Sequence, residues 1–223
     1  MTHHGLRRGH SDRTGGLLYA LGHIGQRQLR LHLWKLLPCY SASHNPMRQI
    51  SLPSITELER RQQEQRLVWT AQRVAVVPGF FAPGELSPKN QEKTREDLCL
   101  DAESCEPDQV LDDQALYIDT NSGVMAILGS AHVGVVNSLD YIRQITHRPI
   151  DAVLGGAHLA NSSAQRRMQT TTTLRAMNLP AIASAHCSGP PAMTALWPVF
   201  PDPIADGSVG TQWTFTQHAP RTL

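Results

Sequence analysis

The chain has 223 residues, of which 40% are hydrophobic and 17% are charged, and its formal net charge is +1. This balance supports a folded core and excludes wholesale disorder, and the length allows one large domain or two small ones. No apolar run reaches the roughly 20 residues that a membrane-spanning helix needs, and four cysteines are too few for a disulfide scaffold. We therefore expect a cytoplasmic protein with no membrane partner and with reduced cysteines, although a Cys99–Cys105 bridge stays open.

The charge is spread unevenly along the chain. Residues 1–50 carry seven Lys/Arg against one acidic residue, whereas residues 51–113 carry seven against thirteen. A basic arm can bind nucleic acid, because phosphates attract Lys and Arg. These arginines are scattered among apolar positions, however, with no stacking aromatic residues beside them. We therefore do not expect nucleic acid to be a partner.

The first half of the chain predicts few regular elements. Apolar residues 17–21 follow a glycine turn and predict the start of a helix, and leucines that alternate with other residues over 29–33 are typical of a half-buried strand. Residues 74–77 predict a short buried strand. Residues 82–113 hold most of the acidic charge and predict a loop, which is longer than a compact domain normally leaves without regular structure.

The second half predicts a regular alternation of strands and helices. In chain order we expect a hairpin over residues 115–128, a helix over 133–145, a strand over 150–154, a helix over 165–177, a strand over 181–183, a helix starting near Pro190 and a strand over 210–215. This alternation places the fold in the α/β class.

Three loops after predicted strands share one pattern, in which small residues precede a histidine. They are Gly129-Ser130-Ala131-His132, Gly155-Gly156-Ala157-His158 and Ser184-Ala185-His186-Cys187-Ser188-Gly189. The α/β folds place their sites at such strand ends, and a histidine there can bind a metal or move a proton. A single histidine of this kind is more often a packing residue, but three at equivalent positions favour one shared site.

The N-terminal segment adds a fourth element. Arg8-Gly9-His10-Ser11-Asp12-Arg13-Thr14-Gly15-Gly16 places His10 and Asp12 two residues apart, ahead of a tight turn. This segment resembles the H-x-H-x-D-H-T-G-G motif of the metallo-β-lactamase superfamily. In that family the histidines and the aspartate bind two zinc ions.

The order of the motifs resembles one branch of that superfamily, the 7,8-dihydropterin-6-methyl-4-(β-D-ribofuranosyl)aminobenzene-5'-phosphate synthase-like metallohydrolases. The matching segments are Pro83-Gly84-Glu85-Leu86, Asp112-Asp113-Gln114-Ala115-Leu116, the stretch from Gly129 to Asn137, Gly155-Gly156-Ala157-His158-Leu159 and His186-Cys187-Ser188-Gly189. The resemblance covers residues 8–215. It implies an αββα metallo-β-lactamase-like sandwich, formed as a single domain over residues 1–223.

The resemblance also implies a ligand set for zinc or manganese. The residues at positions 8, 10 and 132 would hold the first ion, and those at positions 12, 13 and 186 the second. Arg8 and Arg13 stand where the family has histidines, and a guanidinium has no lone pair to donate to a metal. We therefore expect an impaired metal centre, whose remaining ligands are His10, Asp12, His132 and His186.

Three outcomes stay open for this centre. The four remaining ligands can hold one tetrahedral zinc; Arg8 and Arg13 can fill the vacated space and bind a phosphate; or the site is inactive. If the family's chemistry applies, a metal-activated water attacks a phosphorylated pterin- or nucleotide-like small molecule. Asp12 would then be the catalytic residue that binds the metal and orients the hydroxide, and His158 would contact the substrate.

The start of the chain departs from the family as well. Only seven residues precede the N-terminal motif, where the family has a pair of strands. We expect the sandwich to lack these first strands and to expose an unpaired edge, which a homo-oligomer would cover. The sequence leaves open whether the chain is an enzyme, and the alternative is a non-catalytic or inert truncated homologue that binds a phosphorylated ligand through Arg8 and Arg13.

Overall fold

The computed structural model describes residues 4–5, 31–33, 40–42, 46–49, 60, 63–64, 67–69, 71–86, 98–103, 106–111, 113–184, 186–196, 198, 200, 204–206 and 212. The chain divides into two compact units. Unit 1 comprises residues 1–71 and 95–112, and unit 2 comprises residues 72–94 and 113–223. A single domain over residues 1–223 stays a prediction.

Unit 1 contains two small sheets. The first is parallel and consists of β1 (His4–Gly5), β2 (Leu31–Leu33) and β5 (Leu67–Trp69). The second is antiparallel, in the order β4 (Arg48–Gln49), β3 (Tyr40–Ser41) and β8 (Leu98–Cys99). β2 agrees with the strand predicted over residues 29–33, whereas β8 lies in the region predicted as a loop.

The cysteines differ from expectation at one position. Cys99 is disulfide-bonded, and its partner lies outside the described residues. The expectation that all four cysteines are reduced is therefore wrong for Cys99, while Cys187 is a free thiol.

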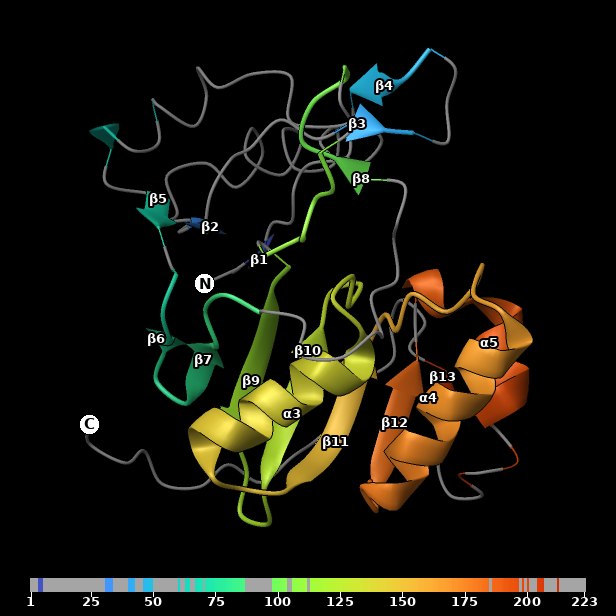
Figure 1. The fold of residues 1–223 in the computed structure, drawn as a ribbon. Helices are drawn as coiled ribbons and strands as arrows, with labels where there is room; N and C mark the ends of the chain where they lie inside the picture. Colours follow the sequence, from blue (N-terminus) through green and yellow to red (C-terminus); the bar gives the residue numbers. More distant parts are fainter. Residues whose placement is uncertain are drawn as a thin grey trace. The chain divides into compact units, whose positions relative to one another are not determined.

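Unit 2 is built on a seven-stranded mixed sheet (Figure 1). Its strand order is β13 (Ile204–Asp206), β12 (Ala181–Ser184), β11 (Ile150–Gly155), β10 (Val124–Leu128), β9 (Ala115–Asp119), β7 (Phe80–Ala82) and β6 (Val74–Val77). The four strands from β10 to β13 run parallel, and β9, β7 and β6 continue the sheet in antiparallel pairs. The α/β class is confirmed.

The predicted hairpin joins β9 to β10. The Thr120 amide donates to the Gly123 carbonyl at 3.0 Å, and the Gly123 amide donates to the Thr120 hydroxyl at 3.0 Å. Gly123 also packs against the loop that precedes β11, because a Cβ at this position would lie 2.5 Å from the Pro149 carbonyl oxygen. The turn therefore closes the β9–β10 hairpin and also packs against the chain just before β11.

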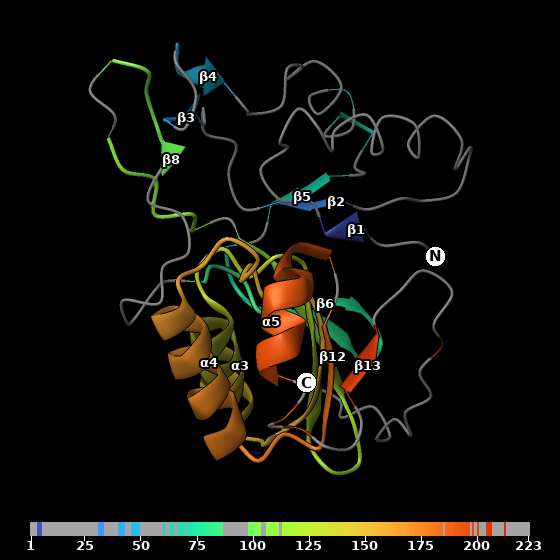
Figure 2. The same ribbon diagram turned by 90° about the vertical axis from the view of Figure 1, so that its right-hand side faces the viewer.

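Helices α3 (Val135–Thr146), α4 (Ala164–Ala176) and α5 (Gly189–Leu196) share one apolar core with the sheet, and Figures 1 and 2 show α3 and α4 lying over the same face. The hydroxyl of Ser163 caps α4 by accepting a hydrogen bond from the Arg166 amide at 3.1 Å. α3 begins two residues later than the predicted start at residue 133, because a turn over residues 131–134 precedes it. The helix near Pro190 is confirmed as α5.

Side chains alternate between the two faces of the sheet. Val124, Ala126 and Leu128 of β10 belong to the core beneath the helices, whereas Met125 and Ile127 belong to a separate apolar cluster. This alternation is the period of two expected of a strand, so the second cluster marks the opposite face. Both faces of the central strands are therefore apolar, as in a sheet covered on two sides.

Tyr117 of β9 is the largest fully buried side chain of the core beneath the helices. Its ring stacks on Phe81 at a centroid distance of 5.2 Å, and the Arg73 guanidinium lies 4.8 Å from the Phe81 ring centroid. Burial raises the pKa of Tyr117 to about 12, against the opposing effect of the positive charge of Arg73.

Some predictions differ from the structure or lie outside its described part. β7 and β13 were not predicted as strands. The helix start at residues 17–21 lies outside the described residues, and so does the predicted strand over 210–215, apart from Gln212. Among the described helices, none combines the length and the apolar character needed to cross a membrane.

Candidate functional site

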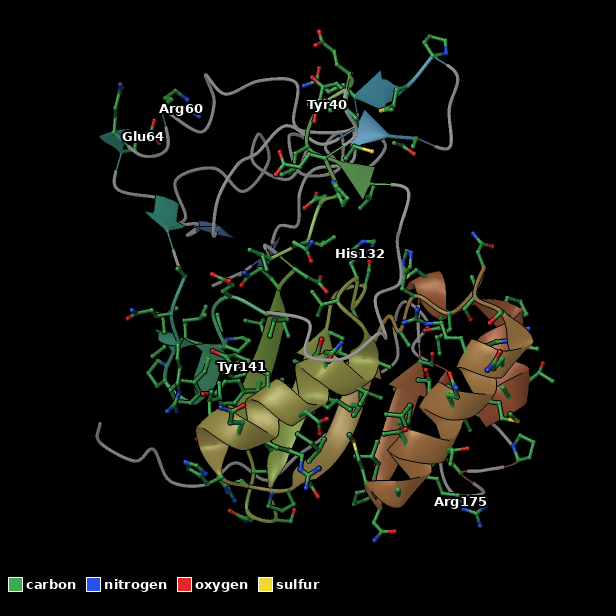
Figure 3. The ribbon with its side chains drawn as sticks, viewed as in Figure 1. Tyr40, Arg60, Glu64, His132, Tyr141 and Arg175 are labelled. Carbon is green, nitrogen blue, oxygen red and sulfur yellow. The ribbon has the colours of Figure 1, made fainter. Side chains whose placement is uncertain are left out.

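The three histidine-bearing loops leave the same edge of the sheet. His132 follows β10, His158 follows β11 and His186 follows β12, and these strands are adjacent and parallel. Because parallel strands end at the same edge, the three loops emerge side by side. Figure 3 shows His132 beyond this end of β10. The equivalent placement predicted from the sequence is confirmed for the three loops.

The side chains of His132 and His158 are in contact. Their ring centroids are 4.3 Å apart, with the ring planes inclined by 52°. His132 is buried, with 4% of its surface exposed, and His158 is half-buried. A pair of imidazoles offers nitrogen atoms that can bind a metal or hydrogen-bond an anion.

The backbone around His132 forms a tight turn. The Gly134 amide donates to the Ala131 carbonyl at 3.0 Å, so His132 and Val133 occupy the two central positions. Ala131 has a φ of 48°, in the left-handed region that a residue with a Cβ seldom adopts. The Val133 amide donates to a carboxylate oxygen of Asp113 at 3.2 Å.

The loop around His158 is bound to the turn that follows β12. His158 itself has a φ of 49°. The Ala157 amide donates to the Ser188 hydroxyl at 3.0 Å, and the Ala160 amide donates to the Cys187 carbonyl at 3.3 Å. Ala131, in the loop of His132, and His158 thus both have left-handed backbone. Such local strain clusters at functional sites.

Close packing also connects the three loops. The Cys187 thiol donates to the Ser130 carbonyl at 3.6 Å. A Cβ on Gly156 would lie 2.7 Å from the Cys187 sulfur and 2.8 Å from the Gly129 carbonyl oxygen. A Cβ on Gly155, whose φ is 113°, would lie 2.0 Å from the Leu128 carbonyl oxygen. Both glycines therefore allow a close approach of backbone that a larger residue would block.

The remaining predicted site residues are not placed. Arg8, His10, Asp12 and Arg13 lie outside the described residues, and of His186 the structure describes the backbone, which begins the short helix η1 (His186–Ser188), but not the side chain. The roles assigned to these five residues stay predictions.

The described residues alone do not complete a metal site. Across the part of the chain that the structure describes, no three side chains among His, Cys, Asp and Glu are grouped to hold an ion. The imidazoles of His132 and His158 have the right chemistry for zinc, but a catalytic zinc normally has three protein ligands.

Two residues with a part in this site were missed by the sequence reasoning. Asp113 and Ser188 lie in segments that carry the family resemblance, but no spacing indicated that their side chains bind the backbone of the histidine loops. Their burial, with 2% and 1% of their surfaces exposed, is the structural sign of this role.

The fold matches a solved structure closely. The crystal structure of a metal-dependent hydrolase of the β-lactamase superfamily superposes with a TM-score of 0.66 and 21% sequence identity, over 80% of this chain and 68% of the other. The chain has the metallo-β-lactamase fold. The expected fold is thereby confirmed, with a seven-stranded sheet and three helices as its described core.

One curated relative of this chain carries the name of the branch that the sequence motifs resemble. It is the 7,8-dihydropterin-6-methyl-4-(β-D-ribofuranosyl)-aminobenzene-5'-phosphate synthase of Methanocaldococcus jannaschii, which is 25% identical over 130 residues. The match covers 56% of this chain and 44% of the relative, so the chain spans less than half of that relative's length. No family model matches the chain.

Proposed function

We propose that the chain is a metallo-β-lactamase-fold hydrolase that acts on a phosphorylated pterin- or nucleotide-like small molecule, with a metal centre impaired at two ligand positions. The observation that carries this proposal is the contact of His132 with His158 at the carboxyl edge of the parallel strands. The two relatives support it, since one is a metal-dependent hydrolase and the other is a pterin-related phosphate synthase.

The proposed ligands are His10, Asp12, His132 and His186, with zinc or manganese as the ion. A bound ion of this kind lowers the pKa of a water and polarises the phosphoryl group under attack. His158 serves the phosphorylated substrate, and Asp12 orients the attacking group. The left-handed backbone and the backbone hydrogen bonds of the two loops support a fixed geometry for His132 and His158.

Arg8 and Arg13 are the reason for proposing an impaired centre. Two unit charges about 4 Å apart interact by roughly 4 kcal/mol at an effective dielectric constant of 20, so a guanidinium beside a divalent ion would cost about twice that. Each arginine must therefore point away from the ion or exclude it. If it excludes the ion, the arginine forks can bind a phosphate directly, which gives the alternative function of a non-catalytic phospholigand-binding module.

Location and partners belong to the same proposal. A small phosphorylated molecule is the proposed partner, and the cytoplasm is the proposed compartment. Disulfides are rare in cytosolic proteins, so the disulfide of Cys99 is an observation that counts against the cytoplasm.

Metal analysis tests the function. The protein is produced without a histidine tag in medium that contains zinc and manganese, and its metal content and phosphoesterase activity are measured. We expect at least one tightly bound ion per chain, with metal and activity both lost in His132→Ala. The matched control is His147→Asn, because His147 is exposed at the end of α3 with a φ of 53°, which asparagine tolerates.

A metal content near zero would refute the catalytic proposal. The double variant Arg8→His/Arg13→His then distinguishes the causes, since renewed metal uptake would assign the loss to the two arginines. The alternative function predicts instead that the wild-type chain binds inorganic phosphate, and that Arg8→Ala/Arg13→Ala weakens this binding.

A further inference from the structure

The loops that carry His132 and His158 are each held by a side chain from another part of unit 2. Asp113, which lies two residues before the start of β9, accepts the hydrogen bond from the Val133 amide. Ser188, at the end of η1, accepts the hydrogen bond from the Ala157 amide. In both cases the bonded amide belongs to the residue directly beside a histidine.

The bond to Asp113 completes the turn around His132. In a four-residue turn the hydrogen bond joins the first and fourth residues, here Ala131 and Gly134, and leaves the amide of the third residue without a partner inside the turn. That third residue is Val133, which has no exposed surface. A buried amide needs an acceptor, and Asp113 supplies it.

The bond to Ser188 has the same effect on the loop around His158. The Ala157 amide is buried and reaches its acceptor in the turn after β12 rather than in its own loop. The neighbouring bond from Ala160 to the Cys187 carbonyl holds the other side of the same loop. His158 therefore lies between two backbone anchors, both provided by residues 187–188.

We propose that Asp113 and Ser188 are positioning residues that set the contact between the His132 and His158 rings. Neither is in the proposed ligand set, and each acts through a backbone amide adjacent to a histidine. The significance of this inference rests on the proposed function, because the ring contact matters for chemistry only if the two histidines share a site. The hydrogen bond from the Val133 amide requires an acceptor oxygen at residue 113, which the side-chain amide of an asparagine also provides.

Nuclear Overhauser contacts between the two imidazole rings test the proposal in the metal-free chain of residues 1–223. The rings are close enough in the wild type to give a cross-peak. We expect this cross-peak to be lost in Asp113→Ala and in Ser188→Ala, and to be retained in Asp113→Asn. Amide hydrogen exchange of β10 and β11 is measured on each variant, to show that the sheet remains folded.

The outcomes separate the possibilities clearly. A ring cross-peak that persists in both alanine variants overturns the proposal, and its loss in Asp113→Asn overturns the acceptor role of Asp113. If Asp113→Ala does not fold, Ser188→Ala decides, since it removes only one hydroxyl oxygen. Absence of metal and of phosphoesterase activity would refute the proposed function but would leave this measurement unaffected, because it is made without metal.

Discussion

Replacing Gly156 with alanine tests how closely the three loops pack. The added Cβ would lie 2.7 Å from the Cys187 sulfur, 2.8 Å from the Gly129 carbonyl oxygen and 3.2 Å from the Ser130 Cα. Ordinary contacts of a Cβ are 3.4–4 Å. Two of the three atoms belong to the backbone of the loop that leads to His132, so rotation of a side chain cannot relieve the clash.

The expected loss of stability follows from two opposing effects. Overpacking in a well-packed interior costs about 1–3 kcal/mol, whereas replacing glycine by alanine gains about 0.4–1 kcal/mol by restricting the unfolded chain. Gly156 does not have a positive φ, so its backbone conformation is open to alanine. The clash of the added Cβ is therefore the one cause of the expected loss of stability. We expect the free energy of unfolding to fall by about 1–2 kcal/mol as the balance of these effects.

Urea unfolding followed by far-UV circular dichroism measures this change, because helices α3, α4 and α5 all belong to unit 2. Gly123→Ala is the matched control: its Cβ would also clash with backbone, at 2.5 Å from the Pro149 carbonyl oxygen, but at the β9–β10 turn. It should destabilise the fold and leave the cross-peak between the rings of His132 and His158 unchanged. Gly156→Ala should lower the free energy of unfolding and also weaken this cross-peak. A variant with wild-type stability and an intact cross-peak would refute the packing argument.

Two further predictions use the same unfolding assay. Burial raises the pKa of Tyr117 from the ordinary 10.0 to about 12. As the pH rises, the unfolded chain therefore loses the phenol proton before the folded chain does. The stability due to the protonated Tyr117 is complete below about pH 10 and is lost between about pH 10 and 12. Tyr117→Phe should therefore lose stability less steeply over that range, by about 2 kcal/mol in total, and parallel pH profiles would contradict this. Ala131, with a φ of 48°, should tolerate glycine better than Ala157, whose φ is not positive: Ala131→Gly should be more stable than Ala157→Gly by about 1 kcal/mol, and equal stabilities would show that the left-handed backbone carries no cost.

The parallel core of unit 2 could be predicted because its sequence signals are strong and local. Apolar runs at residues 124–128 and 150–154 lie between turn residues, and β10 and β11 occupy them. α4 lies within one residue of the helix predicted over 165–177, since Ser163 provides a cap at its start. Short apolar runs bounded by turns and caps fix such elements without any knowledge of their neighbours.

The strands that were missed lack such local signals. β7 has three residues directly after the turn at Gly79, which is too short to show a period of two. β13 follows Pro201 and Pro203, and proline weakens a strand prediction because it cannot donate to a ladder. Both strands are stabilised by pairing with neighbours, β7 with β6 and β9 and β13 with β12.

The candidate site shows the same division. The positions of the His132 and His158 loops followed from their place after predicted strands, and the structure brings the two rings together. The anchors Asp113 and Ser188 could not be predicted, because a hydrogen bond from a backbone amide to a distant side chain depends on the conformation of both loops. The metal ligands at the N-terminus stay predictions.

Within the described part of the chain, three of the contacts that hold the histidine-bearing loops in place do not use the side chain of a proposed metal ligand. They are made by the close approach of Gly156, the carboxylate of Asp113 and the hydroxyl of Ser188. Because these three contacts do not depend on a ligand side chain, the packing of the loops and the binding of a metal are separable properties of the chain. The loops themselves cannot vary independently, because a larger residue at 156 requires a simultaneous change in the loop at 129–130 or at Cys187. Substitutions in this part of the chain should accordingly be tolerated in combinations rather than one at a time.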